Sequence, residues 1–261
     1  MIISKIQGGL GNQLFQYAYG KHLSYKYGIE LRLDTSFYNY KLPGTTPRYF
    51  LLDKFSNTFP NTDINVSLTG PLYKIDDDFN YRELPKPIGC NYYLDGYWQS
   101  EKYFKDSSDL IREDFKPSDE ILTKLSSTPF LDTNTISLHV RRTDYVTSNG
   151  YHPVQTIEYY QKAIETIGDY DYIFVFSDDI EWCKDNLKFD NIIFIEGFTD
   201  IEDLHLMSMC KHNVIANSSF SWWGAWLNNN IDKKVVAPVK WFGDTANLNT
   251  SNIIPDNWIK L

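Results

Sequence analysis

Two adjacent arginines, Arg141 and Arg142, follow the segment Thr135–Val140, whose β-branched and apolar residues are typical of a buried strand. A guanidinium group keeps its charge and presents a planar fork of N–H donors, which suits the oxygen atoms of a phosphate. His139 stands just before the pair and Asp144 just after it. These residue types at the end of a strand predict a binding site for a phosphorylated ligand.

A second group, made of hydrogen-bonding residues and one phenylalanine, runs from the end of a predicted strand, 213–216, into the start of a predicted helix, 220–228. The first N–H groups of a helix have no partner inside it, and together with the helix dipole they favour an anion. Serine hydroxyls at such a place add further donors. The group comprises Asn217, Ser218, Ser219, Phe220 and Ser221.

Two more clusters follow predicted strands. Asp178 and Asp179 come after 172–176, and a glycine-rich segment, 8–12, comes after 2–6. In an open parallel sheet ligands bind outside the carboxyl ends of the strands, so all four clusters would share one edge. A carboxylate such as Asp178 can accept hydrogen bonds from the N1–H and N2–H₂ groups of guanine or from ribose hydroxyls. Together the four clusters predict recognition of a diphosphate.

Each feature also has a purely structural explanation. An Arg–Asp pair at a surface adds little stability, a serine-rich helix start is often only a cap, and His139 fits a core position on its strand. The glycine cluster has only the first two glycines of the dinucleotide fingerprint because position 14 is Leu14, which excludes NAD binding through that motif. The sequence contains no Gly-x-Ser-x-Gly and no P-loop, which excludes those hydrolase and NTPase mechanisms.

Metal binding is not expected. One Asp-x-Asp triplet, 169–171, precedes its strand and so falls at the opposite edge of the sheet, and the other, 76–78, falls in a turn-rich stretch and is interpreted as a solvated turn. Cys90, Cys183 and Cys210 are scattered without CxxC spacing. That pattern excludes a zinc site and a disulfide framework and indicates a reducing compartment.

Composition narrows the class of protein. The 261 residues carry a net charge of −9, so no general attraction to nucleic acid is expected. No stretch approaches 18 consecutive apolar residues, so a membrane span is not expected, and we expect a cytoplasmic location. Aromatic residues make up 16% of the chain, a content that fits carbohydrate sites as well as cores.

Strands and helices alternate in the second half of the chain. Helices are expected after a cap at Thr156, from Asp200 and over 220–228, between strands at 135–140, 172–176, 192–195, 213–216 and 234–237. This alternation predicts βαβ units and a doubly wound parallel sheet. In the first half we expect strands at 2–6, 30–34 and 92–98 and helices at 12–27 and 118–126. The order of secondary-structure elements in the proline-rich stretch 37–87 cannot be predicted from its sequence. We place the domains at 1–130 and 131–261.

Four stretches of the sequence resemble the bacterial α-1,2-fucosyltransferases of glycosyltransferase family 11. The His-x-Arg-Arg-x-Asp motif is shared with α-1,6- and protein O-fucosyltransferases, so it indicates the donor and not the linkage. The glycine motif and Ser-Phe-Ser-Trp-Trp-Gly-Ala are more specific. The stretches are 8–17 (GGLGNQLFQY), 96–104 (GYWQSEKYF), 139–146 (HVRRTDYV) and 217–225 (NSSFSWWGA).

The resemblance implies an α/β fold of the GT-B type with two Rossmann-like domains. It implies GDP-fucose as the donor substrate, a galactose-type acceptor, inversion at the anomeric carbon, and neither a metal nor a cofactor. The C-terminal domain would bind GDP-fucose, and the N-terminal domain would lie on the acceptor side. A peripheral association with the membrane where glycans are assembled stays open.

Residue roles follow from the same resemblance. Arg141 would carry the β-phosphate, with Ser218, Ser219, Phe220 and Ser221 at the helix start and Asn217 before them. His139 and Asp144 would support the nucleotide site, and Asp178 would contact the base or ribose. Gly9, Gly11 and Asn12 would serve the donor from the first domain. Asp203 stands where relatives place an acidic residue. The catalytic group would then comprise Arg141, Asn12 and Asp144.

Some alternatives stay open at this point. The general base is Asp144, His152 or Glu101, because no sequence gives a distance to the acceptor hydroxyl. A GDP-fucose-dependent enzyme of another linkage, α-1,6 or O-linked, remains a rival function. A carbohydrate-binding module would explain the aromatic content, but it would not need an arginine pair and a serine-rich helix start at one edge.

Overall fold

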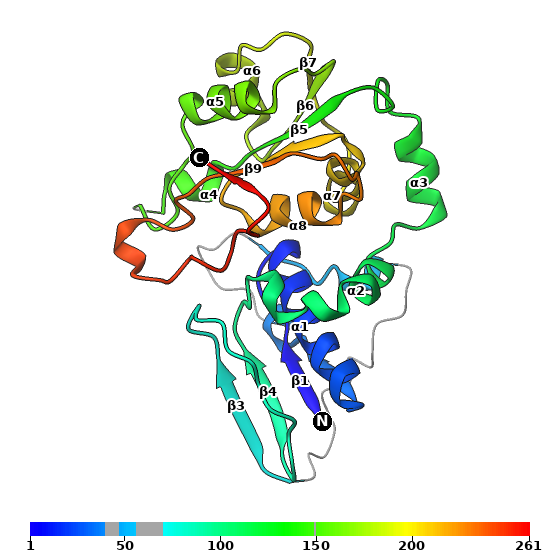
Figure 1. The fold of residues 1–261 in the computed structure, drawn as a ribbon, viewed down its shortest axis with the longest axis vertical. Helices are drawn as coiled ribbons and strands as arrows, with labels where there is room; N and C mark the ends of the chain where they lie inside the picture. Colours follow the sequence, from blue (N-terminus) through cyan, green and yellow to red (C-terminus); the bar gives the residue numbers. More distant parts are fainter. Residues whose placement is uncertain (40–46, 56–69, 149) are drawn as a thin grey trace. The chain divides into compact units, whose positions relative to one another are not determined.

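The computed structural model describes residues 1–39, 47–55, 70–148 and 150–261, and the chain forms two compact units (Figure 1). Unit 1 comprises Met1–Ser118 and Asn249–Pro255, and unit 2 comprises Asp119–Leu248 and Asp256–Leu261. The division at Ser118 comes before the expected boundary at 130/131. The difference is helix α3 (Asp119–Ser126), which belongs to unit 2.

Helix α3 joins unit 2 because it packs on helix α7 (Asp200–Met209). The Leu125 side chain is fully buried in a core cluster with Leu206 and Met207, and Lys124 Nζ pairs with Glu202 Oε1 at 2.7 Å. Neither contact has a local sequence signal, which is why the break near Pro129 looks like a domain boundary in the sequence.

Unit 2 contains a six-stranded sheet in the order β10-β9-β8-β5-β6-β7, and every neighbouring pair is parallel. The doubly wound parallel sheet expected from the sequence is therefore confirmed. Its strands are β5 (Thr135–Val140), β6 (Tyr172–Ser177), β7 (Ile192–Phe194), β8 (His212–Val214), β9 (Val235–Ala237) and β10 (Ile259–Lys260).

Helices cover both faces of this sheet. Figure 1 shows α5 and α6 on one side of β5 and β6, and α7 and α8 on the other. Along β6, Ile173 and Val175 belong to the cluster under α5, while Phe174 and Phe176 belong to the cluster under α7, because successive strand residues point to opposite faces. The helices are α4 (Thr143–Val146), α5 (Ile157–Ile167), α6 (Ile180–Asn186), α7 and α8 (Ser219–Leu227), with a 3₁₀ turn η5 (Asp244–Ala246).

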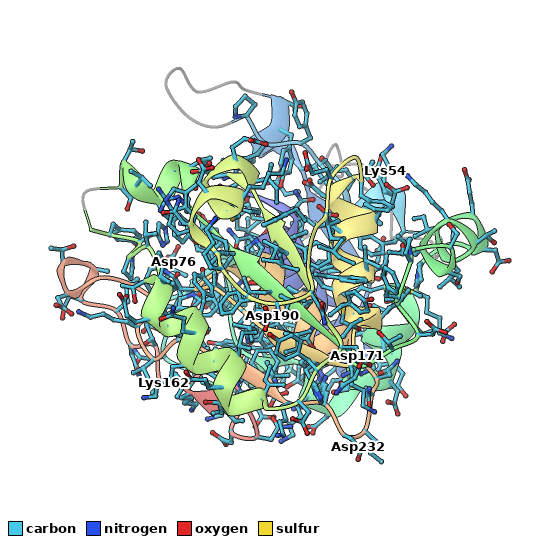
Figure 2. All side chains as sticks on the ribbon, turned by 90° about the horizontal axis from the view of Figure 1, so that it is seen from above. Lys54, Asp76, Lys162, Asp171, Asp190 and Asp232 are labelled. Atoms are coloured by element: carbon cyan, nitrogen blue, oxygen red, sulfur yellow. The ribbon has the colours of Figure 1, made fainter. Side chains whose placement is uncertain are left out.

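Helix α5 shows how local sequence sets an element. The Thr156 hydroxyl accepts a hydrogen bond from the Tyr159 backbone N–H at 3.3 Å, which confirms the expected cap. The buried face carries Tyr160, Ala163, Ile164 and Ile167, whereas Lys162 projects outward from the helix (Figure 2). Such a stripe of apolar residues fixes which side of the helix faces the sheet.

The strand order reverses direction next to β5. From β5 the chain moves through β6 to β7, and after α7 it returns to β8 on the other side of β5 and continues to β9. Strands β5 and β8 are therefore neighbours whose following loops turn to opposite faces of the sheet. Such a switch point is where open α/β sheets form a crevice for ligands.

Unit 1 contains a four-stranded parallel sheet in the order β2-β1-β4-β3. The expected strands at 2–6, 30–34 and 92–98 and the helix at 12–27 are present with small differences in their ends. Its strands are β1 (Ile2–Lys5), β2 (Leu31–Asp34), β3 (Leu72–Asp76) and β4 (Asn91–Asp95), its helices are α1 (Leu10–Tyr27) and α2 (Ser108–Asp114), and its 3₁₀ turns are η1 (Ser36–Asn39), η2 (Leu52–Lys54), η3 (Glu101–Tyr103) and η4 (Lys105–Ser107).

Strand β3 had no sequence signal because it lies at the sheet edge, where Leu72 and Tyr73 are exposed and no apolar alternation is needed. Of the turn-rich stretch around it, 40–46 and 56–69 lie outside the described residues. Among the helices of the described ranges, none is long and apolar enough to cross a membrane.

Candidate functional site

Arg141 lies at the carboxyl end of β5, where the sequence places it. Its guanidinium pairs with Asp144 Oδ1 at 2.7 Å through Nη2 and with Asp178 Oδ2 at 3.2 Å through Nη1. The side chain is about one-fifth exposed (19%) and has the Tyr145 ring 5.5 Å from its guanidinium carbon. Since each terminal nitrogen carries two N–H groups, this held guanidinium keeps donors for a ligand at the rim.

Arg142 has different surroundings. Its Nε pairs with Asp179 Oδ2 at 3.0 Å, and its guanidinium lies 3.9 Å from the centre of the Trp182 ring. Both partners belong to the start of α6, where Asp179 also accepts the Trp182 backbone N–H. Arg142 therefore attaches the loop after β5 to α6.

Asp178 holds the same loop. Oδ1 accepts the backbone N–H of Arg142 at 2.9 Å, and Oδ2 accepts from both the backbone N–H and the hydroxyl of Thr143. Burial opposes ionisation of this carboxyl, but Arg141 and these donors outweigh it and hold the pKa of Asp178 below its usual range. The carboxylate that the sequence assigns to base or ribose thus has its two oxygens engaged by residues 141–143.

Helix α8 begins after β8, beside this loop. Ser218 is its N-cap residue, with extended backbone and no side-chain capping bond, so the first N–H groups of the helix point out of its start. The Ser221 hydroxyl donates to Ser218 O at 3.3 Å, which removes it as a donor to a ligand. Ser218, Ser219 and the first-turn N–H groups remain as anion donors at the positive end of the helix dipole.

Asn217 is buried and its side-chain amide is engaged at both ends. Nδ2 donates to Trp241 O at 2.9 Å, and Oδ1 accepts from Gln155 Nε2 at 3.0 Å. Its backbone carbonyl accepts the Tyr145 hydroxyl at 2.9 Å. The amide that the sequence assigns to donor binding is therefore the clamp that fixes the turn into α8.

The two loops are joined directly. The Tyr145 bond links the loop after β5 to the turn before α8, and the rings of His139 and Phe220 lie 5.8 Å apart. The loop that carries Arg141 and the turn that leads into α8 thus meet at the switch point between β5 and β8. A guanidinium and a helix N-terminus converge there, and both attract an anion.

His139 is buried on β5, and its Nδ1 atom has no hydrogen-bond partner among the described residues. Burial, with the charge of Arg141 added, lowers the pKa of His139 to about 3, so the imidazole is neutral. A satisfied core histidine would have both nitrogens accounted for. The unpaired nitrogen at the strand end instead fits a residue that supports a ligand.

Asp203 is a second polar group without a partner. It lies in the first turns of α7, and its buried Oδ1 atom has no hydrogen-bond partner among the described residues. Burial, and then the nearby charges of Asp200 and Glu202, raise the pKa of Asp203 to about 7. One turn later Met207 faces Gly224 of α8, where an added Cβ would lie 2.9 Å from Met207 Cβ. Asp203 therefore lies on the side of α7 that packs against α8.

Two of the three candidate bases lie in unit 2. Asp144 is tied to Arg141, as described above, and His152 stacks on the Tyr145 ring with centroids 4.5 Å apart. Burial lowers the pKa of His152, so its ring is neutral near pH 7. Glu101, the third, begins η3 in unit 1.

In unit 1 the glycine-rich segment follows β1 and opens α1. Gly8 takes a left-handed conformation (φ +81°), and an added Cβ there would lie 2.9 Å from Asn12 Nδ2. Gly9 is the N-cap residue of α1, and Gly11 is buried in the first turn. Asn12 therefore lies in the first turn of α1 and is not its N-cap residue. Its Oδ1 accepts from Gln99 Nε2 at 2.8 Å.

Sequence reasoning missed the residues that hold this segment. Gln13 Nε2 donates to Gly8 O and Tyr49 O, and Arg48 Nη1 would lie 3.5 Å from a Cβ at Gly9. The available sequence signal for Gln13 was a polar residue next to the apolar stripe of the expected helix. The structure shows that its side chain is fully buried, which is unusual for glutamine. Arg48 had none, because it lies in the unreadable stretch 37–87. No cluster of three or more His, Cys, Asp or Glu side chains that could hold a metal occurs within the part of the chain that the structure describes.

Comparisons with known proteins agree with this arrangement. A family model described as glycosyl transferase family 11 matches residues 71–261. An alpha-1,2-colitosyltransferase from Escherichia coli is 36% identical over 292 residues, covering 100% of this chain and 99% of the relative. The O-antigen biosynthesis glycosyltransferase WbnK from Escherichia coli is 32% identical over 303 residues, covering 99% of each.

Solved structures show the same fold. The fucosyltransferase NodZ from Bradyrhizobium matches with a TM-score of 0.57 and 16% identity, over 85% of this chain and 90% of that one. POFUT1 in complex with GDP matches with a TM-score of 0.51 and 13% identity, over 90% and 98%. The expected GT-B-like α/β class is therefore confirmed. With a family match over most of its length and full-length relatives above 30% identity, the chain belongs to glycosyltransferase family 11 and is a glycosyltransferase.

Proposed function

We propose that the enzyme transfers fucose from GDP-fucose to the 2-hydroxyl of a galactose unit in a glycan or surface polysaccharide, with inversion and without a metal ion or cofactor. The observation that carries this proposal is the convergence of Arg141 and the α8 N-terminus at the switch point between β5 and β8. A diphosphate fits there because both groups attract anionic oxygen.

Arg141 stabilises the departing GDP. Negative charge builds on the β-phosphate as the bond to the sugar breaks, and a guanidinium aimed at that oxygen lowers the barrier. Asp144 and Asp178 hold the guanidinium in place from two sides. The charge that a metal ion supplies in other nucleotide-sugar sites comes here from Arg141 and the helix N–H groups.

Asp203 recognises the guanine in place of Asp178. The Asp178 oxygens are engaged by residues 141–143, whereas Asp203 keeps an unpartnered oxygen on the side of α7 facing α8. Guanine N1–H and N2–H₂ would satisfy that oxygen, and adenine lacks this donor pair. Asp178→Ala should then act on Arg141 and lower kcat, while Asp203→Ala should narrow the difference in affinity between GDP and ADP.

Asn12 serves the reacting sugar from unit 1. Gln99 holds its side-chain oxygen, which leaves the amide nitrogen as the available donor. Because Asn12 is not a helix cap, Asn12→Ala should lower turnover of a protein whose unfolding midpoint stays near that of the parent. A large loss of stability with normal turnover of the folded fraction would contradict this role.

The base is assigned to His152, whose ring is neutral and stacked on Tyr145 next to the diphosphate site. Asp144 is not chosen because its Oδ1 atom is engaged by the Arg141 guanidinium. His152→Phe keeps the stacked ring and removes both nitrogens. We expect it to lower kcat while GDP affinity stays within about twofold.

The relatives support the linkage and raise one alternative. The name of one relative specifies an α-1,2 linkage, which is the linkage proposed here. The same name specifies colitose, which is fucose without its 3-hydroxyl, so a GDP-colitose donor is the second candidate. The NodZ structure soaked with GDP-fucose shares only the fold, at 16% identity and a TM-score of 0.54 over 87% of this chain and 91% of that one.

A donor and acceptor panel tests the proposal. The enzyme is offered GDP-fucose, GDP-colitose, GDP-mannose and UDP-galactose with galactosides and their 2-deoxy analogues, and products are read by mass spectrometry and linkage NMR. We expect fucose on O2 and no product from the 2-deoxy acceptors. Product at O6, exclusive use of GDP-colitose, or transfer from UDP-galactose would each contradict the proposed donor or linkage.

A further inference from the structure

Asp77 connects the segment that follows β3 to the segment that follows β4, the neighbouring strand in the unit 1 sheet. It follows β3, and its Oδ2 atom accepts the backbone N–H groups of Trp98 at 2.8 Å and Tyr97 at 3.2 Å, just beyond β4. Its Oδ1 atom accepts the Phe79 N–H at 2.9 Å. The interpretation of 76–78 as a solvated turn is therefore wrong for Asp77, although it holds for the exposed Asp78.

The segment that Asp77 holds is strained and closely packed. Trp98 takes a left-handed conformation (φ +52°) although it is not glycine, and its side chain is 1% exposed. Its ring lies 4.9 Å from that of Tyr19 and 5.4 Å from that of Tyr103. Such a conformation persists only where the surroundings enforce it, and it is common at functional sites.

Gly96 makes the close approach possible. A Cβ at this position would lie 2.1 Å from Asp77 Cβ, so a larger residue would push the Asp77 side chain away. The Gly96 carbonyl is fixed from the other side by Gln16 Nε2 at 3.0 Å. The backbone from Gly96 to Trp98 is thus set by α1 on one side and by Asp77 on the other.

The residue after Trp98 is Gln99, which donates to Asn12 Oδ1 at 2.8 Å. The backbone conformation at Trp98 sets the direction in which the Gln99 side chain leaves the chain. A relaxed conformation at Trp98 would therefore withdraw the only described hydrogen bond to the Asn12 side-chain oxygen.

We propose that Asp77 is a positioning residue that holds Trp98 in the left-handed conformation so that Gln99 orients the Asn12 amide for the reaction. This inference rests on the proposed function through the role of Asn12. Asp77 touches neither substrate nor reacting atoms, and it acts through the backbone of 97–98.

A double-mutant cycle tests the proposal. We expect Asp77→Ala to lower kcat by on the order of 10-fold to 10²-fold, the scale for a misplaced catalytic group, with KM for the donor changed far less. The double variant Asp77→Ala with Asn12→Ala should be no slower than Asn12→Ala alone, because both changes remove the same function. Losses that multiply would overturn the proposal.

Two further variants separate positioning from simple destabilisation. Asp77→Asn keeps one carbonyl oxygen for the two N–H groups and should restore most of kcat. Asp78→Ala is the matched control, since Asp78 contacts only Asn80 and Arg82 in the described bonds, and it should leave kcat unchanged. An equal kcat loss in Asp77→Asn and Asp77→Ala at unchanged fold, or a normal kcat in Asp77→Ala, would count against the proposal.

A spectroscopic signature keeps the test independent of folding yield and of the donor. The side-chain amide resonance of Asn12, assigned by its absence in Asn12→Ala, should shift in Asp77→Ala and stay in place in Asp78→Ala. An unmoved resonance in both would overturn the coupling. A normal kcat for Asn12→Ala would overturn both this inference and the role of Asn12, whereas the donor and linkage would still be decided by the product analysis.

Discussion

Arg141 and Arg142 are neighbours in the chain that face different partners. Side chains of successive residues leaving a strand point to opposite sides, so one guanidinium stays at the rim and the other turns to α6. Arg141 is held by two carboxylates, and Arg142 by Asp179 and the face of Trp182. The chemistry of transfer is therefore assigned to the first arginine and the attachment of the loop to the second.

Substituting each arginine by lysine separates these roles. Lysine keeps the charge but loses the planar fork, so Arg141→Lys should lower kcat by on the order of 10²-fold or more, the scale for losing one donor to developing charge. Affinity for the donor should fall less than the rate. Steady-state kinetics with the proposed donor measure both quantities.

Arg142→Lys is the matched control and should be much milder in rate, while Arg142→Ala should lower stability. A near-parental kcat for Arg141→Lys together with an inactive Arg142→Lys would show that the two assignments are reversed. If both lysine variants turn over normally, the diphosphate lies elsewhere.

The proposed role of Asp203 predicts that guanine recognition depends on pH. Its pKa of about 7 in the free protein means that the carboxyl is largely protonated below that pH, whereas acceptance of guanine donors needs the ionised form. GDP affinity should therefore rise as pH increases from about 6 to 8, with proton release on binding in the lower half of this range. Isothermal titration calorimetry in buffers of different ionisation enthalpy measures both.

Asp203→Asn isolates this effect from the titration of the phosphate itself. The variant should bind GDP more weakly. Its GDP affinity should also change less with pH than that of the parent, because only the titration of the phosphate remains. Folding stability without ligand should change with pH in the opposite direction to GDP affinity. The folded state holds an extra proton on Asp203 between the unfolded pKa of 3.8 and about 7, so the protein becomes less stable as pH rises through that window. Identical pH profiles for GDP binding in the two proteins would remove Asp203 from the base site.

At the scale of elements, helix α7 begins with a reciprocal cap. The Thr199 hydroxyl accepts the Glu202 backbone N–H at 3.4 Å, and Glu202 Oε2 accepts the Thr199 N–H at 2.8 Å. This capping box fixes the first turns of the helix, in which Asp203 lies. Lys124 of α3 pairs with the same Glu202, so the helix start, the candidate base-recognition residue and the docking of α3 depend on one cap.

Thr199→Ala should cost about 1 kcal/mol of unfolding free energy, because the Glu202 N–H at the helix start loses the Thr199 hydroxyl as its acceptor. Thr166→Ala in α5 is the matched control, since that hydroxyl only donates to Lys162 O within the helix and should change stability by less than about 0.5 kcal/mol. Urea unfolding with an unchanged m-value measures both. Equal effects for the two threonines would contradict the cap.

At the scale of the whole molecule, the site has its positive charge in side chains and helix ends. We therefore expect full activity in excess EDTA. A rate that falls with the chelator and recovers on addition of Mg²⁺ or Mn²⁺ would show that a metal takes part, and Arg141 would then have a different role.

Local sequence predicted the parts of this molecule that local physics determines. The alternation of apolar runs and caps such as Thr156 was sufficient for the unit 2 sheet and its helices, and the strand-end rule was sufficient to place Arg141 at the carboxyl end of β5. Partner choice was not accessible in the same way. Asn217 and Asp178 have residue types that suit a ligand, yet their bonds go to Trp241, Gln155 and the loop at 141–143, because hydrogen-bond partners distant in sequence decide which polar group is left over.

The same limit applies to unit 1. Asp77 reads as one of three acidic residues in a turn, and only its approach to the backbone of Trp98 distinguishes it from Asp76 and Asp78. Strand β3 lies at an exposed edge, where burial imposes no alternation on the sequence. The helix α3 boundary was misjudged for a related reason, since the packing of Leu125 against α7 is a long-range contact.

The path of the chain between the units limits how this protein can change by recombination. Residues Asn249–Pro255 return to unit 1, where Asn249 Nδ2 bonds Asn80 Oδ1 at 2.9 Å and Asn252 Oδ1 accepts from Lys102, and the chain then re-enters unit 2 to form β10. A single crossover at 118 would exchange the first segment of unit 1 but not Asn249–Pro255. The foreign sheet would then have to pack with a segment from the other parent. Hybrid enzymes in which unit 1 is exchanged therefore need two additional junctions, at 248 and 255, so the two units are expected to diverge together within a lineage rather than to be exchanged separately.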